Sequence, residues 1–202
     1  LRVNSPGGSA YASEQIWEAL EQFKKRSGRP FYVSMGDVAA SGGYYISCGA
    51  DRIYADPLTI TGSIGIFGLI PNAQKLMNDK LGITTSTVST NSGTFPTFTE
   101  PMSEKQRAAM QGYVNRGYEL FVGRVASGRD MSVDSVKAIA EGRVWDGRSA
   151  LSLGLVDRMG GMMQAISDMA EEIEAGDDYC IREYPRLTVS YTHLTLPTTE
   201  RV

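Results

Sequence analysis

Two glycine-rich segments contain the residues in this chain that are best suited to chemistry. The first is Asn-Ser-Pro-Gly-Gly-Ser at residues 4–9, and the second is Gly-Asp-Val-Ala-Ala-Ser-Gly-Gly-Tyr at residues 36–44, which contains Ser41. Each segment follows a short apolar run and precedes a helical pattern, so each is predicted to be a turn between a strand and a helix. We expect Ser41 in the first turn of its helix, where unpaired backbone N–H groups favour developing negative charge.

The two turns together favour acyl transfer with a serine nucleophile. A tetrahedral oxyanion needs donors, and the backbone amides of Gly7 and Gly42 are accessible because glycine has no side chain. Loss of one such donor typically costs roughly 3 kcal/mol of transition-state stabilisation. Taken alone, each turn has a structural interpretation, since small residues before a helix also permit close packing. Their occurrence on two successive strand–helix units favours peptide hydrolysis.

A nucleophilic serine needs a base, and this chain offers few. Its one histidine is His193, in a C-terminal segment of unusual composition, so we do not expect a Ser-His-Asp triad within the chain. The alternative is a lysine whose pKa is lowered by desolvation. All lysines lie in polar helical contexts typical of solvated side chains: Lys24, Lys25, Lys75, Lys80, Lys105 and Lys137. The sequence therefore predicts that the base is missing from this chain.

Strand and helix patterns alternate through the first half, which predicts an α/β protein. Strands are expected at residues 1–4, 31–35, 53–55, 64–67 and 84–90, and helices at 11–27, 39–49 and 72–80. The second half is predicted to be mainly helical, at residues 103–127, 132–141, 148–153 and 160–175. Ser103 and Gln106 have the spacing of a capping box at the start of the longest helix.

Composition excludes several classes of protein. The net charge is −3, and no basic cluster with interleaved aromatic residues is present, which argues against nucleic-acid binding. No run approaches the roughly 18–20 apolar residues that span a bilayer. The two cysteines, Cys48 and Cys180, have neither the spacing of a zinc site nor that of a disulfide framework, and we expect Cys48 to be buried. No metal and no cofactor is implied.

The ends of the chain suggest truncation. Leu1 begins within a predicted strand, and the Thr-rich residues from Val189 onward break from the preceding charged pattern. That segment resembles a translated adaptor sequence, although a genuine Thr-rich edge strand is the alternative. We therefore predict one catalytic domain at residues 1–188, truncated at its N-terminus, and a non-native tail at residues 189–202.

Several segments resemble the signal peptide peptidase family, also called protease IV. They are residues 4–9 and 36–45, Asp-Arg-Ile-Tyr-Ala-Asp-Pro at 51–57, Thr-Gly-Ser-Ile-Gly at 61–65, Arg-Val-Trp-Asp-Gly-Arg-Ser-Ala at 143–150, and Gly-Leu-Val-Asp at 154–157. They occur in the family's order and cover most of residues 1–165. The resemblance implies a ClpP/crotonase-like fold, a spiral of ββα units, here with a mainly helical C-terminal part.

The resemblance also implies roles for individual residues. Ser41 matches the nucleophile, Gly7 and Gly42 match oxyanion donors, and Ser63 matches a serine that orients the lysine base. From the residues alone, Ser63 would be a turn serine in a glycine-flanked strand. Short family members carry the lysine in a loop that corresponds to residues 89–96, which contain none. The chain therefore resembles the second half of a long-form member, with the lysine on the absent first half, and would be inactive alone.

The function that this resemblance implies is a Ser-Lys serine endopeptidase that degrades released signal peptides. The family also implies a homo-oligomer at the periplasmic face of the bacterial inner membrane, with the anchor outside this chain. Two alternatives stay open. One is a crotonase-type acyl-CoA enzyme, which needs no serine at position 41, and the other is a catalytically silent half whose role is assembly.

Overall fold

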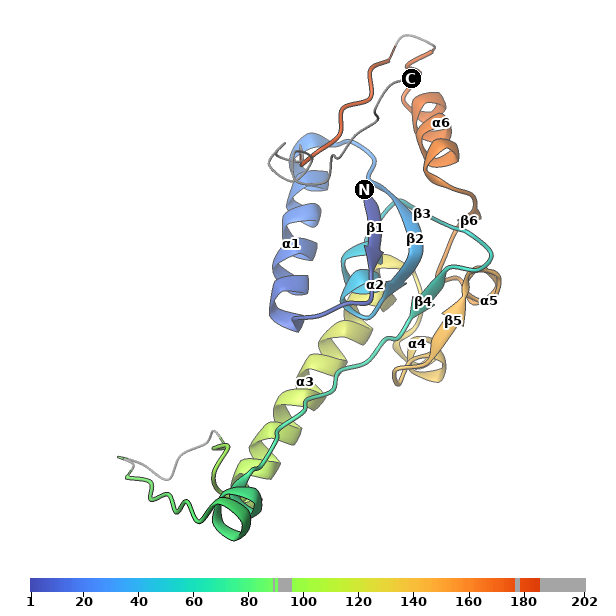
Figure 1. Ribbon diagram of the computed structural model, residues 1–202. Coiled ribbons are helices and arrows are strands. Elements are labelled where there is room, and N and C mark those ends of the chain that lie inside the picture. The colour runs from blue at the N-terminus through green and yellow to red at the C-terminus, as the bar shows by residue number, and fades with distance from the viewer. Residues whose placement is uncertain (89, 91–95, 177–178, 186–202) are drawn as a thin grey trace, which may run out of the picture. The chain divides into compact units, whose positions relative to one another are not determined.

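The structure is a computed structural model that describes residues 1–88, 90, 96–176 and 179–185. Six strands of the described part form one mixed sheet, in which all neighbours are parallel except β4 and β5 (Figure 1). They are β1 (Arg2–Ser5), β2 (Tyr32–Ala40), β3 (Arg52–Ala55), β4 (Ile60–Gly62), β5 (Val144–Asp146) and β6 (Arg158–Met159). The fold class is therefore mixed α/β, as predicted.

Strand β2 lies at the centre of the sheet and has different neighbours along its length. One edge pairs with β1, while the other pairs with β3 at its start and with β4 at its end. At the end of β2, Ala39 pairs with Ser5 of β1 on one side and with Thr61 of β4 on the other. Since the three strands are parallel, their carboxyl ends meet at one edge of the sheet, which is where open α/β sheets commonly bind ligands.

A bulge shapes the end of β2. Between two consecutive pairings, β1 covers Val3–Ser5 while β2 covers the longer range Met35–Ala39. The side chain of Asn4 fills this irregularity, because its Oδ1 accepts a hydrogen bond from Val38 N at 3.1 Å. A Cβ atom on Gly36 would lie 2.7 Å from Asn4 Cγ, so a residue with a side chain does not fit there.

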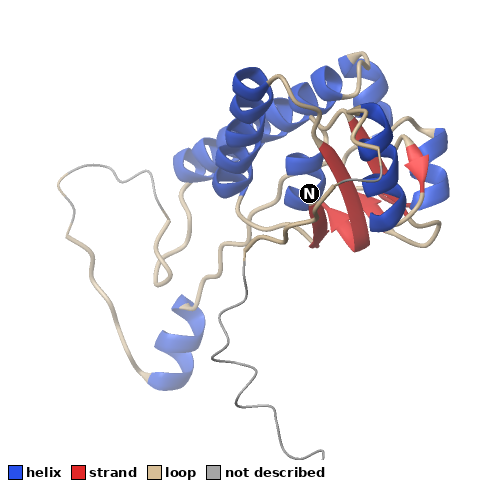
Figure 2. Ribbon diagram, turned by 90° about the horizontal axis from the view of Figure 1, so that it is seen from above, coloured by secondary structure: helices blue, strands red, loops and turns tan. Residues whose placement is uncertain are grey.

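The helices pack around this sheet, and α2 lies at the middle of the core. The helices are α1 (Ala10–Ser27), α2 (Gly42–Ser47), α3 (Glu104–Gly128), α4 (Val133–Ile139), α5 (Gly147–Ser152) and α6 (Met162–Glu172), with a π-helical turn at Leu76–Lys80. Helix α2 contacts α1, β1 and α3. Tyr44 of α2 and Phe121 of α3 are among the largest fully buried side chains. Figure 2 shows α1 and α3 beside the strands, and the π-helical turn on a segment that leaves them.

Most predicted elements are confirmed, including the capping box of Ser103 and Gln106 at the start of α3. The helix predicted from residue 39 begins only at Gly42, because Val38–Ala40 pair with β4 and belong to β2. Cys48 is fully buried, as predicted.

Two predicted strands are wrong. The strand predicted at residues 64–67 lies earlier, at Ile60–Gly62, where the chain can pair with both β2 and β5. Residues 84–88 form no strand and are exposed, because no neighbouring strand of the described chain pairs with them. Residues 89 and 91–95 of that region lie outside the described residues.

The chain divides after Met169 into two units. The first contains the whole sheet, and the described part of the second consists of the end of α6 and irregular segments. The predicted boundary at residue 188, the tail at 189–202 and His193 all lie outside the described residues. Of the helices described, none has the length and apolar character needed to cross a membrane.

A side-chain hydrogen bond between β4 and β2 gives a test of the fold. It lies at the edge of the sheet where the parallel strands end. Thr61 is fully buried, and its hydroxyl donates to Ala39 O at 2.7 Å. We predict that Thr61→Val lowers the free energy of unfolding by about 1 kcal/mol, because the carbonyl loses a donor. The measurement is urea unfolding of this chain. The exposed Thr85→Val is the control and should change stability by less than about 0.5 kcal/mol; equal effects would contradict the assigned contact.

Candidate active site

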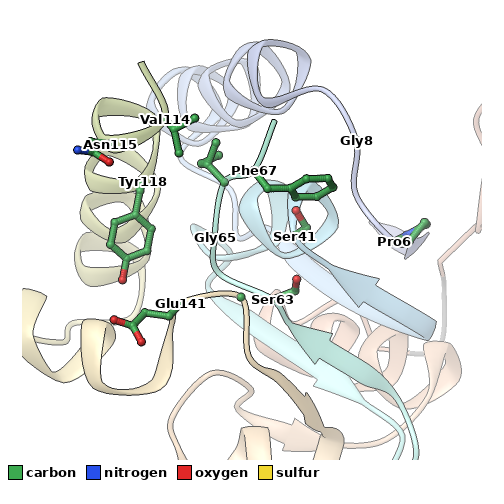
Figure 3. Close-up of a pocket in the computed structure, with 12 residues that line it drawn as sticks. Pro6, Gly8, Ser41, Ser63, Gly65, Phe67, Val114, Asn115, Tyr118 and Glu141 are labelled. Atoms are coloured by element: carbon green, nitrogen blue, oxygen red, sulfur yellow. The ribbon is translucent and has the colours of Figure 1, made fainter. Parts of the chain in front are cut away.

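Ser41 occupies a strained backbone position between β2 and α2. Its φ is 53° and its ψ is −119°, a conformation that residues with side chains rarely adopt and that costs of order 1–3 kcal/mol. Two hydrogen bonds hold it there: Ser41 N donates to Gly62 O at 2.9 Å, and Tyr45 N donates to Ser41 O at 2.8 Å. The Ser41 hydroxyl does not cap the helix, so it is available to the pocket beside it (Figure 3).

The two glycine turns predicted from the sequence are in direct contact. Gly7 has a φ of 104°, and a Cβ atom there would lie 2.7 Å from both Ser41 Cβ and Gly42 N. On the other side, a Cβ atom on Gly42 would lie 2.5 Å from Ser13 Oγ and 3.2 Å from Gly8 N. The approach of the two turns therefore requires glycine in both.

The amides of the first turn differ in their availability. Gly7 N donates to the hydroxyl of Ser5 at 3.1 Å, whereas Gly8 lines the pocket that contains Ser41. From the sequence, the amides of both Gly7 and Gly8 are expected to be exposed, but only Gly7 was predicted as a donor to the oxyanion. The role of Gly7 and Gly42 as oxyanion donors stays a prediction, and Gly8 joins them as a candidate.

Ser63 lies directly after β4 and lines the same pocket as Ser41. Its φ of 50° is also in the left-handed region. Ser63 N donates to Arg143 O at 2.8 Å, and Gly142 N donates to Ile64 O at 3.0 Å, so this segment is paired along one edge. Ser41 and Ser63, which are distant in the sequence, are thus brought to one site by neighbouring parallel strands (Figure 3).

The pocket has a volume of about 690 Å³ and mainly apolar walls. One wall is the segment after Ser63, and the opposite wall is a face of α3 (Figure 3). The side chains that form these walls are Ile66, Phe67, Val114, Asn115 and Tyr118. Glu141 is the one acidic or basic residue that lines it in the described chain. Such a pocket suits an apolar side chain beside a reactive serine.

None of the six lysines lines the pocket. Lys24 forms an ion pair with Asp51 at 3.0 Å. Lys137 donates a hydrogen bond to Glu119, which raises the pKa of Lys137 and opposes the role of a base. Burial raises the pKa of Cys48 to about 12, so its thiol stays protonated. The described part of the chain contains no group of His, Cys, Asp or Glu side chains able to hold a metal ion.

The sequence matches known proteases. Residues 23–176 match the profile of Peptidase family S49. The chain is 40% identical over 184 residues to "Protease 4" of Haemophilus influenzae, which covers 91% of this chain and 30% of that protein. It is 39% identical over 194 residues to "Putative signal peptide peptidase SppA" of Enterococcus faecium, covering 95% of this chain and 55% of that protein. It is also 37% identical over 169 residues to "Serine protease SPPA, chloroplastic" of Arabidopsis thaliana, covering 83% of this chain and 24% of that protein. The chain thus spans between a quarter and about half of these relatives.

The contact between the two turns gives a second test. We predict that Gly7→Ala lowers the free energy of unfolding by about 3 kcal/mol, because the new methyl group adds a steric clash to an unfavourable φ. Gly28→Ala is the matched control: its φ is 63°, but nothing lies within 4 Å of the added Cβ. The control should cost only about 1 kcal/mol. Urea unfolding of both variants measures the difference, and equal losses would contradict the close contact.

Proposed function

The chain belongs to Peptidase family S49, and from this premise we propose that it is the serine-bearing part of a signal peptide peptidase with a Ser-Lys dyad. The observation that carries the proposal is the contact of Ser41 with the Gly7–Gly8 turn. That contact puts a strained serine beside backbone amides, at the edge where three parallel strands end. This is the arrangement that acyl transfer requires.

In the proposed reaction, Ser41 Oγ attacks the carbonyl carbon of a peptide bond and its proton passes to a neutral lysine amine. The resulting tetrahedral oxyanion collapses, the C–N bond breaks, and the leaving amine takes the proton from the lysine. The acyl group remains as an ester on Ser41. Water then attacks this ester, gives a proton to the lysine, and releases the peptide acid as the proton returns to Ser41.

Backbone amides stabilise the oxyanion in this proposal. We assign one donor to Gly42, at the start of α2, and the second to the Gly7–Gly8 turn. Within that turn Gly8 is the better candidate, because Gly7 N already donates to Ser5 Oγ and Gly8 lines the pocket. Each donor of this kind is typically worth about 3 kcal/mol in the transition state.

The lysine is supplied from outside this chain. None of its own lysines lines the pocket, and the chain aligns with only part of each long relative. We propose that the lysine comes from the absent half, in the same or a neighbouring protomer, and that Ser63 orients it. Ser63 suits this role because its backbone is held by Arg143 while it faces the pocket that contains Ser41.

The proposed substrates are released signal peptides, which are short, unfolded and apolar. An extended peptide can pair with the backbone after Gly62, because Arg143 and Gly142 occupy only one edge of that segment. The apolar walls of the pocket, including Val114 and Tyr118, suit an apolar side chain next to the scissile bond.

We further propose the ClpP/crotonase-like fold and a homo-oligomer for the complete protein, located at the periplasmic face of the bacterial inner membrane. The mixed sheet, with its parallel strand–helix units, is consistent with that fold. Support for the oligomer comes from the segment between β4 and α3, which leaves large apolar side chains in solvent. Phe67 is 90% exposed, Leu69 87% and Val88 98%.

We predict that Ser41→Ala in the full-length enzyme lowers cleavage of a released signal peptide by a factor of at least about 10³, because the nucleophile is lost. The assay measures kcat/KM, with circular dichroism to verify folding. Retained cleavage would contradict the proposal, and binding of a CoA thioester would then favour a crotonase-type enzyme over a silent assembly half.

We also predict that Ser63→Ala lowers kcat by about 10²-fold with a smaller change in KM, because the lysine is less well oriented. Ser152→Ala is a suitable control, because Ser152 is exposed on α5 and does not line the pocket. If Ser63→Ala retained the wild-type kcat, the role assigned to Ser63 would be wrong, while the role of Ser41 would still stand.

A further inference from the structure

Three side chains join α1, α2 and α3 to one another. Glu14 lies in α1, Tyr45 in α2 and Arg124 in α3. The Tyr45 hydroxyl donates to Glu14 Oε2, while Arg124 donates to both carboxylate oxygens of Glu14. One carboxylate thus binds groups from two other helices at the same time. We refer to these three residues as the helix clamp.

The helix clamp is more strongly held than an ordinary surface ion pair. The side chains of Glu14 and Arg124 are 27% and 31% exposed, and Tyr45 is buried. The guanidinium of Arg124 also lies over the ring of Trp17, one turn further along α1, with Cζ 3.9 Å from the ring centroid. Bidentate contact and ring stacking both restrict where an arginine can lie. The relative positions of α1 and α3 are therefore closely defined.

The pKa shifts of Glu14 and Tyr45 also indicate that the Glu14 carboxylate is firmly bound in the helix clamp. Burial by itself would raise the pKa of Glu14, but hydrogen bonds from Arg124 and Tyr45 outweigh burial, so the pKa lies below its ordinary value. Burial and the bond to Glu14 raise the pKa of Tyr45. The carboxylate is thus charged and the phenol protonated at neutral pH, which are the states in which both hydrogen bonds form.

Each member of the helix clamp is linked to one part of the active site. Tyr45 lies one turn after Ser41, whose carbonyl accepts the hydrogen bond of Tyr45 N. Glu14 follows Ser13, whose hydroxyl packs against Gly42. Arg124 lies on α3 beyond Tyr118, which forms a wall of the pocket. Movement of any one helix would therefore shift the nucleophile, the glycine turns or the pocket wall relative to the others.

We propose that Glu14, Tyr45 and Arg124 are positioning residues that hold Ser41, the Gly7–Gly8 turn and the α3 wall of the pocket in their reactive arrangement. They lie outside the residues that line the pocket and touch no reacting atom. This inference rests on the proposed function. Its effect is on kcat, since a displacement of about 1 Å near the reacting atoms can cost on the order of 100-fold in rate.

The chain contains a matched cluster of the same chemistry elsewhere. The Tyr54 hydroxyl donates to Asp168 Oδ2 at 2.7 Å, and Arg158 donates to the same oxygen at 2.9 Å. This cluster joins β3 to α6, and its residues do not line the pocket of Ser41. Variants of this cluster therefore serve as a control, because they lose a tyrosine–carboxylate–arginine contact and should change stability without changing the active site.

The experiment compares Glu14→Gln and Tyr45→Phe with Asp168→Asn and Tyr54→Phe in the full-length enzyme. The readouts are kcat and KM for a released signal peptide, well below the melting temperature of every variant, with Ser41→Ala as the inactive reference. We expect Glu14→Gln to lower kcat by about 10- to 100-fold with KM within about threefold. The two control variants should keep kcat within about twofold, although their melting temperatures fall.

A second comparison separates a joint role from two independent ones. If the helix clamp acts as a unit, the double variant of Glu14→Gln and Tyr45→Phe should lose no more kcat than Glu14→Gln alone. Should Glu14→Gln fail to fold, Tyr45→Phe carries the test, because it leaves the pair of Glu14 and Arg124 intact.

Two results would overturn the inference: a wild-type kcat in Tyr45→Phe and Glu14→Gln, or equal loss of kcat in the control variants. Either result with an inactive Ser41→Ala rejects the positioning role and leaves the proposed function intact. If Ser41→Ala itself retains cleavage, the proposed function is wrong, and the positioning role of the helix clamp is wrong with it.

Discussion

Parallel pairing of β1, β2 and β4 at a single register is the constraint on which the rest of the structure depends. Ser5, Ala39 and Thr61 are adjacent across these strands, so the chain leaves all three at the same edge of the sheet. The Gly7–Gly8 turn, Ser41 and Ser63 follow within two or three residues. A shift of one residue in any pairing would turn these groups to different sides. The fold thus assembles the candidate site through backbone hydrogen bonds.

Residues at this edge of the sheet have strained backbone conformations, and the surrounding structure holds them in these conformations. Ser41 and Ser63 both have left-handed backbones, and the glycine turns approach one another without room for a Cβ atom. The amides of Ser41 and Ser63 donate to the carbonyls of Gly62 and Arg143, and these hydrogen bonds secure the serines. The buried side chains of α2 secure the helix behind Ser41. Strain of this kind is common at functional sites, where it fixes reactive groups before substrate binds. In the proposed enzyme, the helix clamp adds a restraint from outside the pocket.

Local patterns in the sequence predicted the two glycine turns, Ser41 and most helices, because turn residues and helical periodicity act over short distances. The position of β4 was not predictable in this way, since Ile60–Gly62 is a strand owing to its partners β2 and β5. Residues 84–88 have a strand-like composition but form no strand, because no strand among the described residues pairs with them. Long-range packing places Gly8 in the pocket, forms the pocket walls and brings Glu14 to Arg124. Spacing along the chain does not reveal such contacts.

In the proposed mechanism, Ser41 is the only nucleophile and its base lies outside this chain. The most direct measurement is labelling of the full-length enzyme with a serine-reactive fluorophosphonate, followed by peptide mass spectrometry, in parallel with this chain alone. We expect one covalent adduct, on Ser41, that forms in the full-length enzyme and at a far lower rate in the isolated chain. An adduct on another serine, or equally fast labelling of the isolated chain, would contradict this mechanism.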